Sequence, residues 1–136
     1  MWRRDRPPDL PTILLAEGND SLRRLLGRLL AEQGYRVLGA GTRQAVVEQL
    51  RVAPRIDLVI ADRGIRGLPV WDIVHEANER HPGVPCIRLI EERTDALPVY
   101  GVEPGTEALL QRPVTIVALL VAIEGLLSRK QPTSSH

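Results

Sequence analysis

The sequence lacks the residue types that several kinds of site require. Among its 136 residues phenylalanine is absent, Cys86 is the single cysteine, and Lys130 is the single lysine. One cysteine excludes an internal disulfide bond and a metal site built from cysteines. A site that needs a lysine has no candidate before Lys130, so arginine must supply the cationic groups of the expected fold.

Long apolar segments and an excess of one charge are also missing. The longest largely apolar run, Val114 to Ile123, is too short to cross a membrane, and Met1 to Leu10 is charged and contains prolines, unlike a signal peptide. The net charge is +1, so nothing indicates binding to nucleic acid or to an anionic membrane. With 43% hydrophobic and 26% charged residues, we expect a single cytoplasmic domain with an ordinary core.

Short apolar segments alternate with amphipathic segments along the chain. Strands are expected at residues 12–16, 35–38, 58–61, 86–90 and 108–111, and helices at residues 21–33, 42–51, 70–80, 94–102 and 114–128. Asn19 or Asp20 should cap the first helix, and Gly34 should end it. Such alternation favours a parallel sheet with right-handed crossovers and helices on both faces. Residues 1–11 are expected to be an irregular lead-in, and residues 129–136 a disordered tail.

Asp62 follows the expected third strand directly and precedes Arg63 and Gly64. In open parallel α/β sheets, ligands and reacting groups gather at the carboxyl ends of the strands. A carboxylate is costly there unless it is paired, which makes Asp62 the first functional candidate. A turn or helix-cap aspartate agrees equally well with this segment taken alone.

Two other patterns indicate no function. The segment GAGTRQ at residues 39–44 is superficially similar to a dinucleotide-binding loop, but it follows the second expected strand and has Gln44 at the third glycine position. His75 and His81 have no further ligands at the spacing of a metal site. The sequence also contains no Walker-type loop and no nucleophile elbow.

Several segments together resemble the receiver domain of two-component response regulators. They are PTILLAEGND with the helix after it, IDLVIADRGIRG, PCIRLI and LLQRPV, and they extend the resemblance from Pro11 to Ser128. The resemblance implies one domain at residues 12–128 with a flavodoxin-like, doubly wound α/β fold and a five-stranded parallel sheet in the order 2-1-3-4-5. It also implies that a histidine kinase or a phosphotransfer protein passes a phosphoryl group to the aspartate that ends the third strand, here Asp62.

The metal positions depart from the family. The resemblance implies two acidic residues after the first strand that hold Mg²⁺, and this sequence has Glu17 and Gly18 there. Mg²⁺ prefers an octahedron of hard oxygen ligands. Glu17, Asp62 and the carbonyl group of Gly64 are the ligands that remain, so we expect Mg²⁺ binding to be weak or absent.

The switch positions depart as well. The Ser or Thr that the family has at the end of the fourth strand is Ile90, the aromatic residue of the fifth strand is Leu109, and the lysine before a proline is Arg112. Arg112 can still pair with Asp62 or with a phosphate, whereas Ile90 cannot donate a hydrogen bond. Phosphoryl transfer to a carboxylate depends on positioning and charge neutralisation. We therefore expect an atypical receiver with weak or impaired phosphorylation.

The last expected helix is apolar on two sides. Its core stripe is Ile116, Leu119, Leu120, Ile123 and Leu127, and its outer side carries Val114, Val117, Ala118, Val121, Ala122 and Gly125. A helix that is apolar all round is expected to be covered all round, either by the lead-in or by a partner. We favour a partner and expect a constitutive homodimer through Val117, Ala118, Val121 and Ala122.

Two other functions agree with parts of the sequence. A pseudo-receiver would act only as a dimerisation or docking module and would not need Mg²⁺. An enzyme with Asp62 as its nucleophile, for instance a phosphatase, would need a metal site and a general acid that we do not find, so we do not expect an enzyme.

Overall fold

Five short strands form one parallel sheet in the order β2-β1-β3-β4-β5. The structure is a computed structural model and describes residues 10–62, 65, 70–90, 107–111 and 115–130. Its elements are β1 (Thr12–Ala16), α1 (Asp20–Glu32), β2 (Arg36–Ala40), α2 (Arg43–Val52), β3 (Leu58–Asp62), α3 (Val70–Arg80), β4 (Cys86–Ile90), β5 (Glu107–Gln111) and α4 (Ile116–Lys130). The strand order is the one that the resemblance to receiver domains implies, and the flavodoxin-like α/β fold is confirmed.

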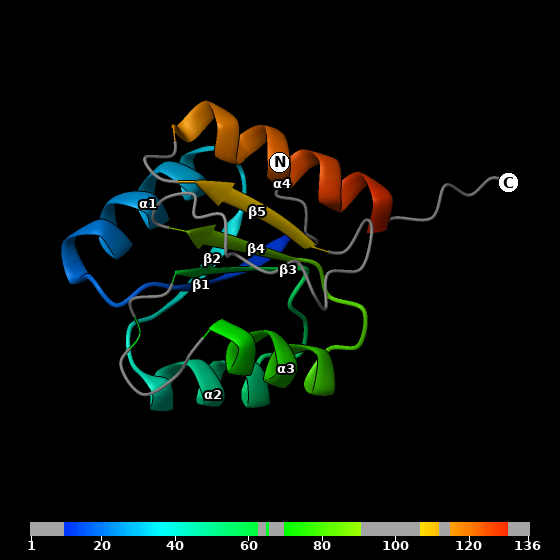
Figure 1. The fold of residues 1–136 in the computed structure, drawn as a ribbon. Helices are drawn as coiled ribbons and strands as arrows, with labels where there is room; N and C mark the ends of the chain where they lie inside the picture. The colour runs from blue at the N-terminus through cyan, green and yellow to red at the C-terminus, as the bar shows by residue number, and fades with distance from the viewer. Residues whose placement is uncertain (1–9, 63–64, 66–69, 91–106, 112–114, 131–136) are drawn as a thin grey trace, which may run out of the picture.

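The sheet is covered by helices on both faces, with α2 and α3 on one side and α1 and α4 on the other (Figure 1). Successive side chains of a strand point to opposite faces, and β1 is buried at every position. Leu14 and Ala16 belong to the cluster on the α2 and α3 side, whereas Ile13 and Leu15 belong to the cluster on the α1 and α4 side. This double burial explains why the strand segments are continuously apolar.

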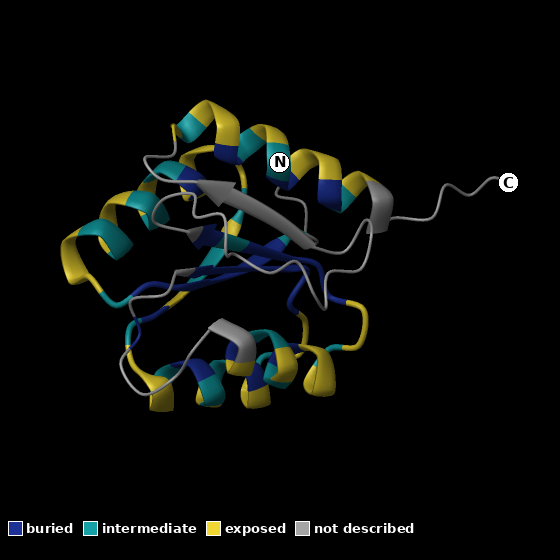
Figure 2. Ribbon diagram, viewed as in Figure 1, coloured by how far each residue is buried: buried dark blue, intermediate teal, exposed yellow. Residues whose placement is uncertain are grey.

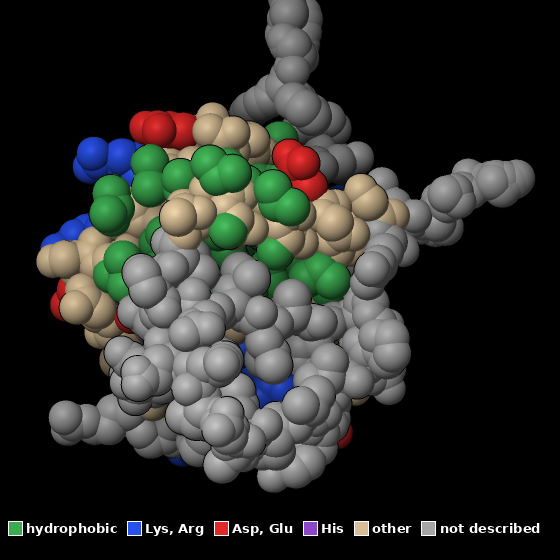
Figure 3. Space-filling view, turned by 45° about the horizontal axis from the view of Figure 1, so that its top comes forward, with side chains coloured by type: hydrophobic (Ala, Val, Ile, Leu, Met, Phe, Trp, Pro, Cys, Tyr) green, Lys and Arg blue, Asp and Glu red, His purple; other side chains and the backbone are tan. Residues whose placement is uncertain are grey.

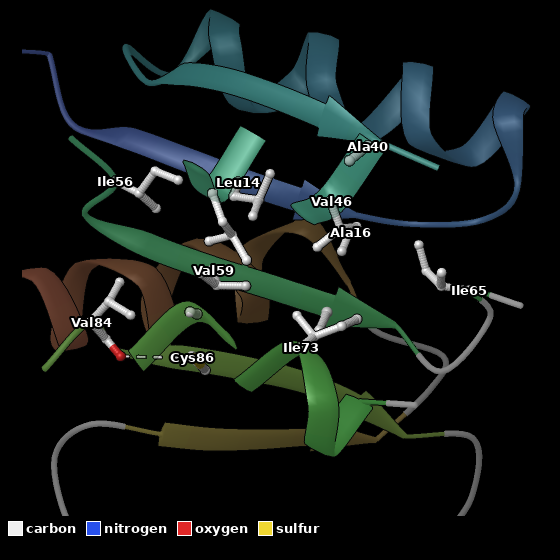
Figure 4. Packing of buried hydrophobic residues seen from close by; sticks show 13 residues of the cluster. Leu14, Ala16, Ala40, Val46, Ile56, Val59, Ile65, Ile73, Val84 and Cys86 are labelled. Atoms are coloured by element: carbon white, nitrogen blue, oxygen red, sulfur yellow. Dashed lines mark hydrogen bonds between the residues drawn. The ribbon is translucent and has the colours of Figure 1, made fainter. Parts of the chain in front are cut away.

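Each helix contributes a narrow apolar stripe to the nearer cluster. Val46 of α2 and Ile73 of α3 belong to one cluster with Leu14 and Val59 of the sheet, and Figure 4 shows Val46 beside Ala16. The outward sides of the helices are exposed, as Figure 2 shows. No helix in the described part of the chain is long and apolar enough to cross a membrane.

Local hydrogen bonds fix the ends of the first helix as predicted. The Asn19 Oδ1 atom accepts a hydrogen bond from the Leu22 N–H at 2.8 Å, so Asn19 is the N-cap of α1. Gly34 follows the helix with φ +98°, a conformation that favours glycine. The predicted bounds of β1, α3 and β4 are likewise confirmed.

Other predicted bounds are wrong by one or two residues. β2 extends to Ala40, because its pairing with β1 continues through Gly39, where the apolar pattern ends. The last helix begins at Ile116 because Thr115 caps it, with the Thr115 Oγ1 atom 3.0 Å from the Ala118 nitrogen. The same helix continues to Lys130, two residues into the expected tail. Residues 1–9, the expected helix at 94–102 and residues 131–136 lie outside the described residues.

The core stripe of α4 also differs from the expectation. Leu119, Ile123 and Leu126 are the buried residues, so Leu126 belongs to the core although the sequence pattern left it out. Ala122 was expected on the outer side but is half-buried and packs against the same cluster. The remaining outer residues Val117 and Val121 are 66% and 64% exposed. No described residue of the chain covers this side of α4, so its expected cover by a partner stays a prediction.

A buried carboxylate joins β1 to β3 at the amino ends of the strands. The Asp57 Oδ2 atom accepts a hydrogen bond from the Thr12 N–H at 2.8 Å, and the Asp57 N–H donates to the Thr12 carbonyl group at 2.8 Å. The Arg55 Nε atom lies 3.0 Å from both carboxylate oxygens. Thr12 and Asp57 are both buried. This double link fixes the start of β1 against the segment that leads into β3.

Replacing Asp57 by alanine should lower the free energy of unfolding by about 2 kcal/mol, because the buried Thr12 N–H loses its acceptor. Arg55→Ala should cost under about 1 kcal/mol, since the Arg55 side chain is 49% exposed. Urea unfolding followed by circular dichroism measures both changes. Equal stability of Asp57→Ala and the parent protein would contradict this role of the carboxylate.

Candidate functional site

Two acidic residues stand at neighbouring positions on the carboxyl edge of the sheet. Ala16 of β1 and Ala61 of β3 are partners in the parallel register. Glu17 and Asp62 are the next residue of each segment. Adjacent strands lie about 4.8 Å apart, so the two backbones present these residues side by side. The sheet thus brings together Glu17 and Asp62, two of the four residues that we expect to bind Mg²⁺ or the phosphoryl group. The other two are Gly64 and Arg112.

Glu17 is buried and held by its backbone and by its carboxylate. Glu17 is 2% exposed, and its Oε2 atom accepts a hydrogen bond from the Asn19 N–H at 3.0 Å. The Glu17 N–H donates to the Ala40 carbonyl group at 3.0 Å, and the Glu17 carbonyl group accepts from Arg23 Nη1 at 2.9 Å. A buried carboxylate with fixed geometry can act as a hard ligand for a cation.

The residues after Glu17 offer no second ligand at this edge. Gly18 has no side chain, and the Asn19 side chain is used as the cap of α1. Asp20 pairs with Arg23, with Arg23 Nη2 2.8 Å from Asp20 Oδ1, and its side chain is 70% exposed. Among the described residues, no group of three His, Cys, Asp or Glu side chains could hold a metal ion. The described residues alone therefore do not make a Mg²⁺ site.

One cavity lined by described residues lies away from this edge. It has a volume of about 490 Å³ and opens between the C-terminal ends of α2 and α3, beside Leu50, Glu76 and His81. The His81 Nε2 atom lies 3.0 Å from the Leu50 carbonyl oxygen and therefore donates to it, which joins the two helix ends. The cavity is thus a feature of helix packing, and the carboxyl edge remains the candidate site.

The fold and the sequence have known counterparts, although no family model matches the chain. A response regulator receiver domain protein from Clostridium thermocellum is 25% identical and superimposes with a TM-score of 0.78, covering 89% of this chain and 97% of that one. A response regulator receiver protein from Sinorhizobium medicae WSM419 has a TM-score of 0.79 at 24% identity, over 90% and 98% of the two chains. The transcriptional regulatory protein GlrR of Escherichia coli (strain K12) is 31% identical over 126 residues, which are 91% of this chain.

The chain thus has the fold of a response regulator receiver domain, and its similarity in sequence is to response regulators. It spans 28% of the length of GlrR. The likeness to GlrR therefore concerns this domain and not the whole of that protein.

In the receiver fold, the remaining candidate positions lie in or directly after β3, β4 and β5, and Leu109 is in the middle of β5. Ile90 is the last residue of β4 and is in register with Gln111, and Leu109 of β5 is in register with Arg88. For Asp62, Ile90 and Leu109 the structure describes the backbone position, and the roles of their side chains remain predictions. Gly64 and Arg112 lie outside the described residues.

The receiver also contains a half-buried arginine that the sequence analysis missed. Arg88 lies in the middle of β4, between its register partners Ala61 and Leu109, and its Nε atom is inaccessible to solvent. It lies one register position before the level of Asp62. The signal in the sequence was a single charge within the apolar run PCIRLI. A cation on this strand near the acidic edge makes the electrostatic potential at that edge less negative.

Proposed function

We propose that this receiver accepts a phosphoryl group on Asp62 slowly or not at all, with a histidine kinase or a phosphotransfer protein as the donor. The observation that carries the proposal is the carboxyl edge of the sheet, where the buried Glu17 adjoins the end of β3 and is followed by Gly18. An acceptor carboxylate at this edge has one acidic neighbour on β1 where the family has two. The folded unit that we infer for this function begins at β1 and ends with α4.

The reduced set of ligands accounts for the expected slow transfer. We infer that Glu17, Asp62 and the Gly64 carbonyl group would hold Mg²⁺ weakly, because the protein supplies three ligand groups and only two of them are charged. When bound, the metal ion would neutralise the charge of the phosphoryl oxygens. Arg112, at the family's lysine position, would pair with Asp62 or with the phosphate. Ile90 supplies no hydroxyl group to a phosphoryl oxygen.

A pseudo-receiver that works only as a dimerisation or docking module is the second candidate. Gly18 and Ile90 favour it, since each removes a group that phosphorylation would use. Metal titration distinguishes the two candidates. A phosphorylatable receiver requires Mg²⁺, and a docking module binds its partner equally well without it.

Incubation with acetyl phosphate and Mg²⁺ should leave most of the protein unmodified after the time in which an ordinary receiver is fully labelled. Any adduct should be absent from Asp62→Asn, because the amide is a poor nucleophile. Intact-protein mass spectrometry measures the modified fraction. Rapid stoichiometric modification of the parent protein would refute impaired phosphorylation, and modification of Asp62→Asn would refute the acceptor.

The variant Gly18→Asp should bind Mg²⁺ roughly tenfold more tightly than the parent, because it restores a hard oxygen ligand. Without metal it should melt at a lower temperature, since another carboxylate then stands beside Glu17. Isothermal titration calorimetry and thermal unfolding measure the two effects. Gly18→Ala is the matched control, because it adds a Cβ atom without an oxygen. Equal Mg²⁺ affinity in all three proteins would mean that position 18 does not limit metal binding.

We further propose that two copies of the chain associate through the outer face of α4. Val117 and Val121 are one helical turn apart and are 66% and 64% exposed, and the exposed Ala118 adjoins them. Figure 3 shows hydrophobic side chains gathered over the part of the surface where α4 lies. Small side chains let two helices approach closely, and a symmetric pair would place each stripe against its own copy. Ala122, half-buried against the core, would contribute less than the sequence suggested.

The protein should sediment as a dimer at tens of micromolar without any phosphodonor. The double variant Val117→Glu with Val121→Glu should be a monomer, because charge would be trapped in an apolar contact with its own copy. Leu25→Glu is the control, since Leu25 is an exposed leucine of α1 with 51% exposure and lies outside the proposed contact. A monomeric parent protein would refute the homodimer.

A further inference from the structure

The Arg23 side chain spans the loop between β1 and α1. Arg23 lies in the first turn of α1, yet only 21% of its side chain is exposed. Its Nη1 atom donates to the Glu17 carbonyl group at 2.9 Å, and its Nη2 atom pairs with Asp20 Oδ1 at 2.8 Å. The two branches of one guanidinium group therefore hold both ends of the four-residue segment from Glu17 to Asp20.

Two glycines of the neighbouring segment leave room for this arginine. A Cβ atom on Gly39 would lie 3.4 Å from Arg23 Cδ, which is an ordinary contact. A Cβ atom on Gly41 would overlap the guanidinium group of Arg23. Neither glycine has the left-handed φ that Gly34 and Gly83 show. Gly41 is thus explained by the space that Arg23 occupies, and not by its own backbone conformation.

Glu17 is consequently held on three sides. β2 accepts its N–H through Ala40, Arg23 donates to its carbonyl group, and the Asn19 N–H donates to its carboxylate. The first two contacts fix the backbone of Glu17, and the third fixes the side chain relative to that backbone. Loss of the Arg23 contact would free the carbonyl group and the turn that follows it.

We propose that Arg23 is the positioning residue of the acidic site, and that Gly41 is required because it admits the guanidinium group. The proposal rests on the proposed function in taking Glu17 as a ligand for Mg²⁺. A receiver with a single acidic side chain after β1 depends on the placement of that side chain more than a receiver with two. The glycines of the GAGTRQ segment thereby acquire a role in the site that has nothing to do with a dinucleotide.

The test compares Gly41→Ala and Arg23→Lys with Gly39→Ala. The first two variants keep a positive charge near the site but remove the forked contact. In Gly41→Ala the new Cβ atom displaces the guanidinium group, and in Arg23→Lys the side chain has a single ammonium group in place of two branches. Gly39→Ala adds the same Cβ atom two residues earlier in the segment, at a tolerable distance from Arg23. Any difference between Gly41→Ala and Gly39→Ala therefore reflects the guanidinium group and not the general cost of a Cβ atom.

Hydrogen exchange of the Asn19 amide, followed by NMR, reports on the Glu17 carboxylate that accepts its proton. In Gly41→Ala and in Arg23→Lys it should be about tenfold faster, the factor that one lost charge-assisted hydrogen bond gives. Gly39→Ala should leave it unchanged, and the Val59 amide of β3 should exchange at the parent rate in all variants. The double variant Gly41→Ala with Arg23→Lys should be no worse than either single variant, because both remove one interaction.

Mg²⁺ titration monitored by the same amide adds the functional measurement. The dissociation constant should rise in Gly41→Ala and in Arg23→Lys, and should not change in Gly39→Ala. Unchanged Asn19 exchange in both variants, or additive effects in the double variant, would overturn the positioning role. If the parent protein binds no Mg²⁺, the metal ligand role of Glu17 fails, and the exchange measurement still decides the role of Arg23. If Gly41→Ala does not fold, Arg23→Lys carries the test.

Discussion

Burial of the sheet on both faces is the constraint on which the rest of this receiver depends. Side chains of β1 from Ile13 to Ala16 point alternately into the two clusters and are all buried, so charged groups have no place along this strand. Charged side chains are displaced to the ends of the strands, where the chain leaves the core. The acidic positions and the buried carboxylate that joins β1 to β3 are found at such ends. Arg23, a residue of α1, reaches the end of β1 through its guanidinium group. Arg88, within β4, is the described exception.

The sequence pattern was sufficient to predict a parallel sheet with helices on both faces, because its apolar runs are short, regular and interrupted by clear turn residues, whereas the strand order came from the resemblance to receiver domains. β1, α3 and β4 have the predicted bounds, and Asn19 and Gly34 have the predicted roles at the ends of α1. The errors arise where pairing or capping between distant residues overrides local pattern. β2 is longer because it pairs with β1, and Leu126 is buried because it packs into the cluster that contains Leu119 and Ile123.

The candidate site was predictable in its position but not in its internal contacts. A strand followed by an acidic residue indicates the carboxyl edge of the sheet, and the register places Glu17 and Asp62 at adjacent positions there. The contact between Arg23 and the Glu17 carbonyl group has no such signal, because it joins a helix side chain to a backbone oxygen. The sequence analysis noted Gly41 only as part of the GAGTRQ segment. The structure shows that a side chain at this position would overlap Arg23, which is 18 positions earlier in the chain.

The link between Asp57 and Thr12 lies at the amino ends of the strands, opposite the acidic edge. One end of the sheet therefore carries a structural link, and the other carries the acidic residues for which we propose a function. Substitutions at the acidic end, for example at Gly18, leave the link at the opposite end intact. A lineage can thus lose or retune phosphorylation in small steps without passing through an unfolded protein. The departures of this chain from the receiver family are of the kind that such a division of labour permits.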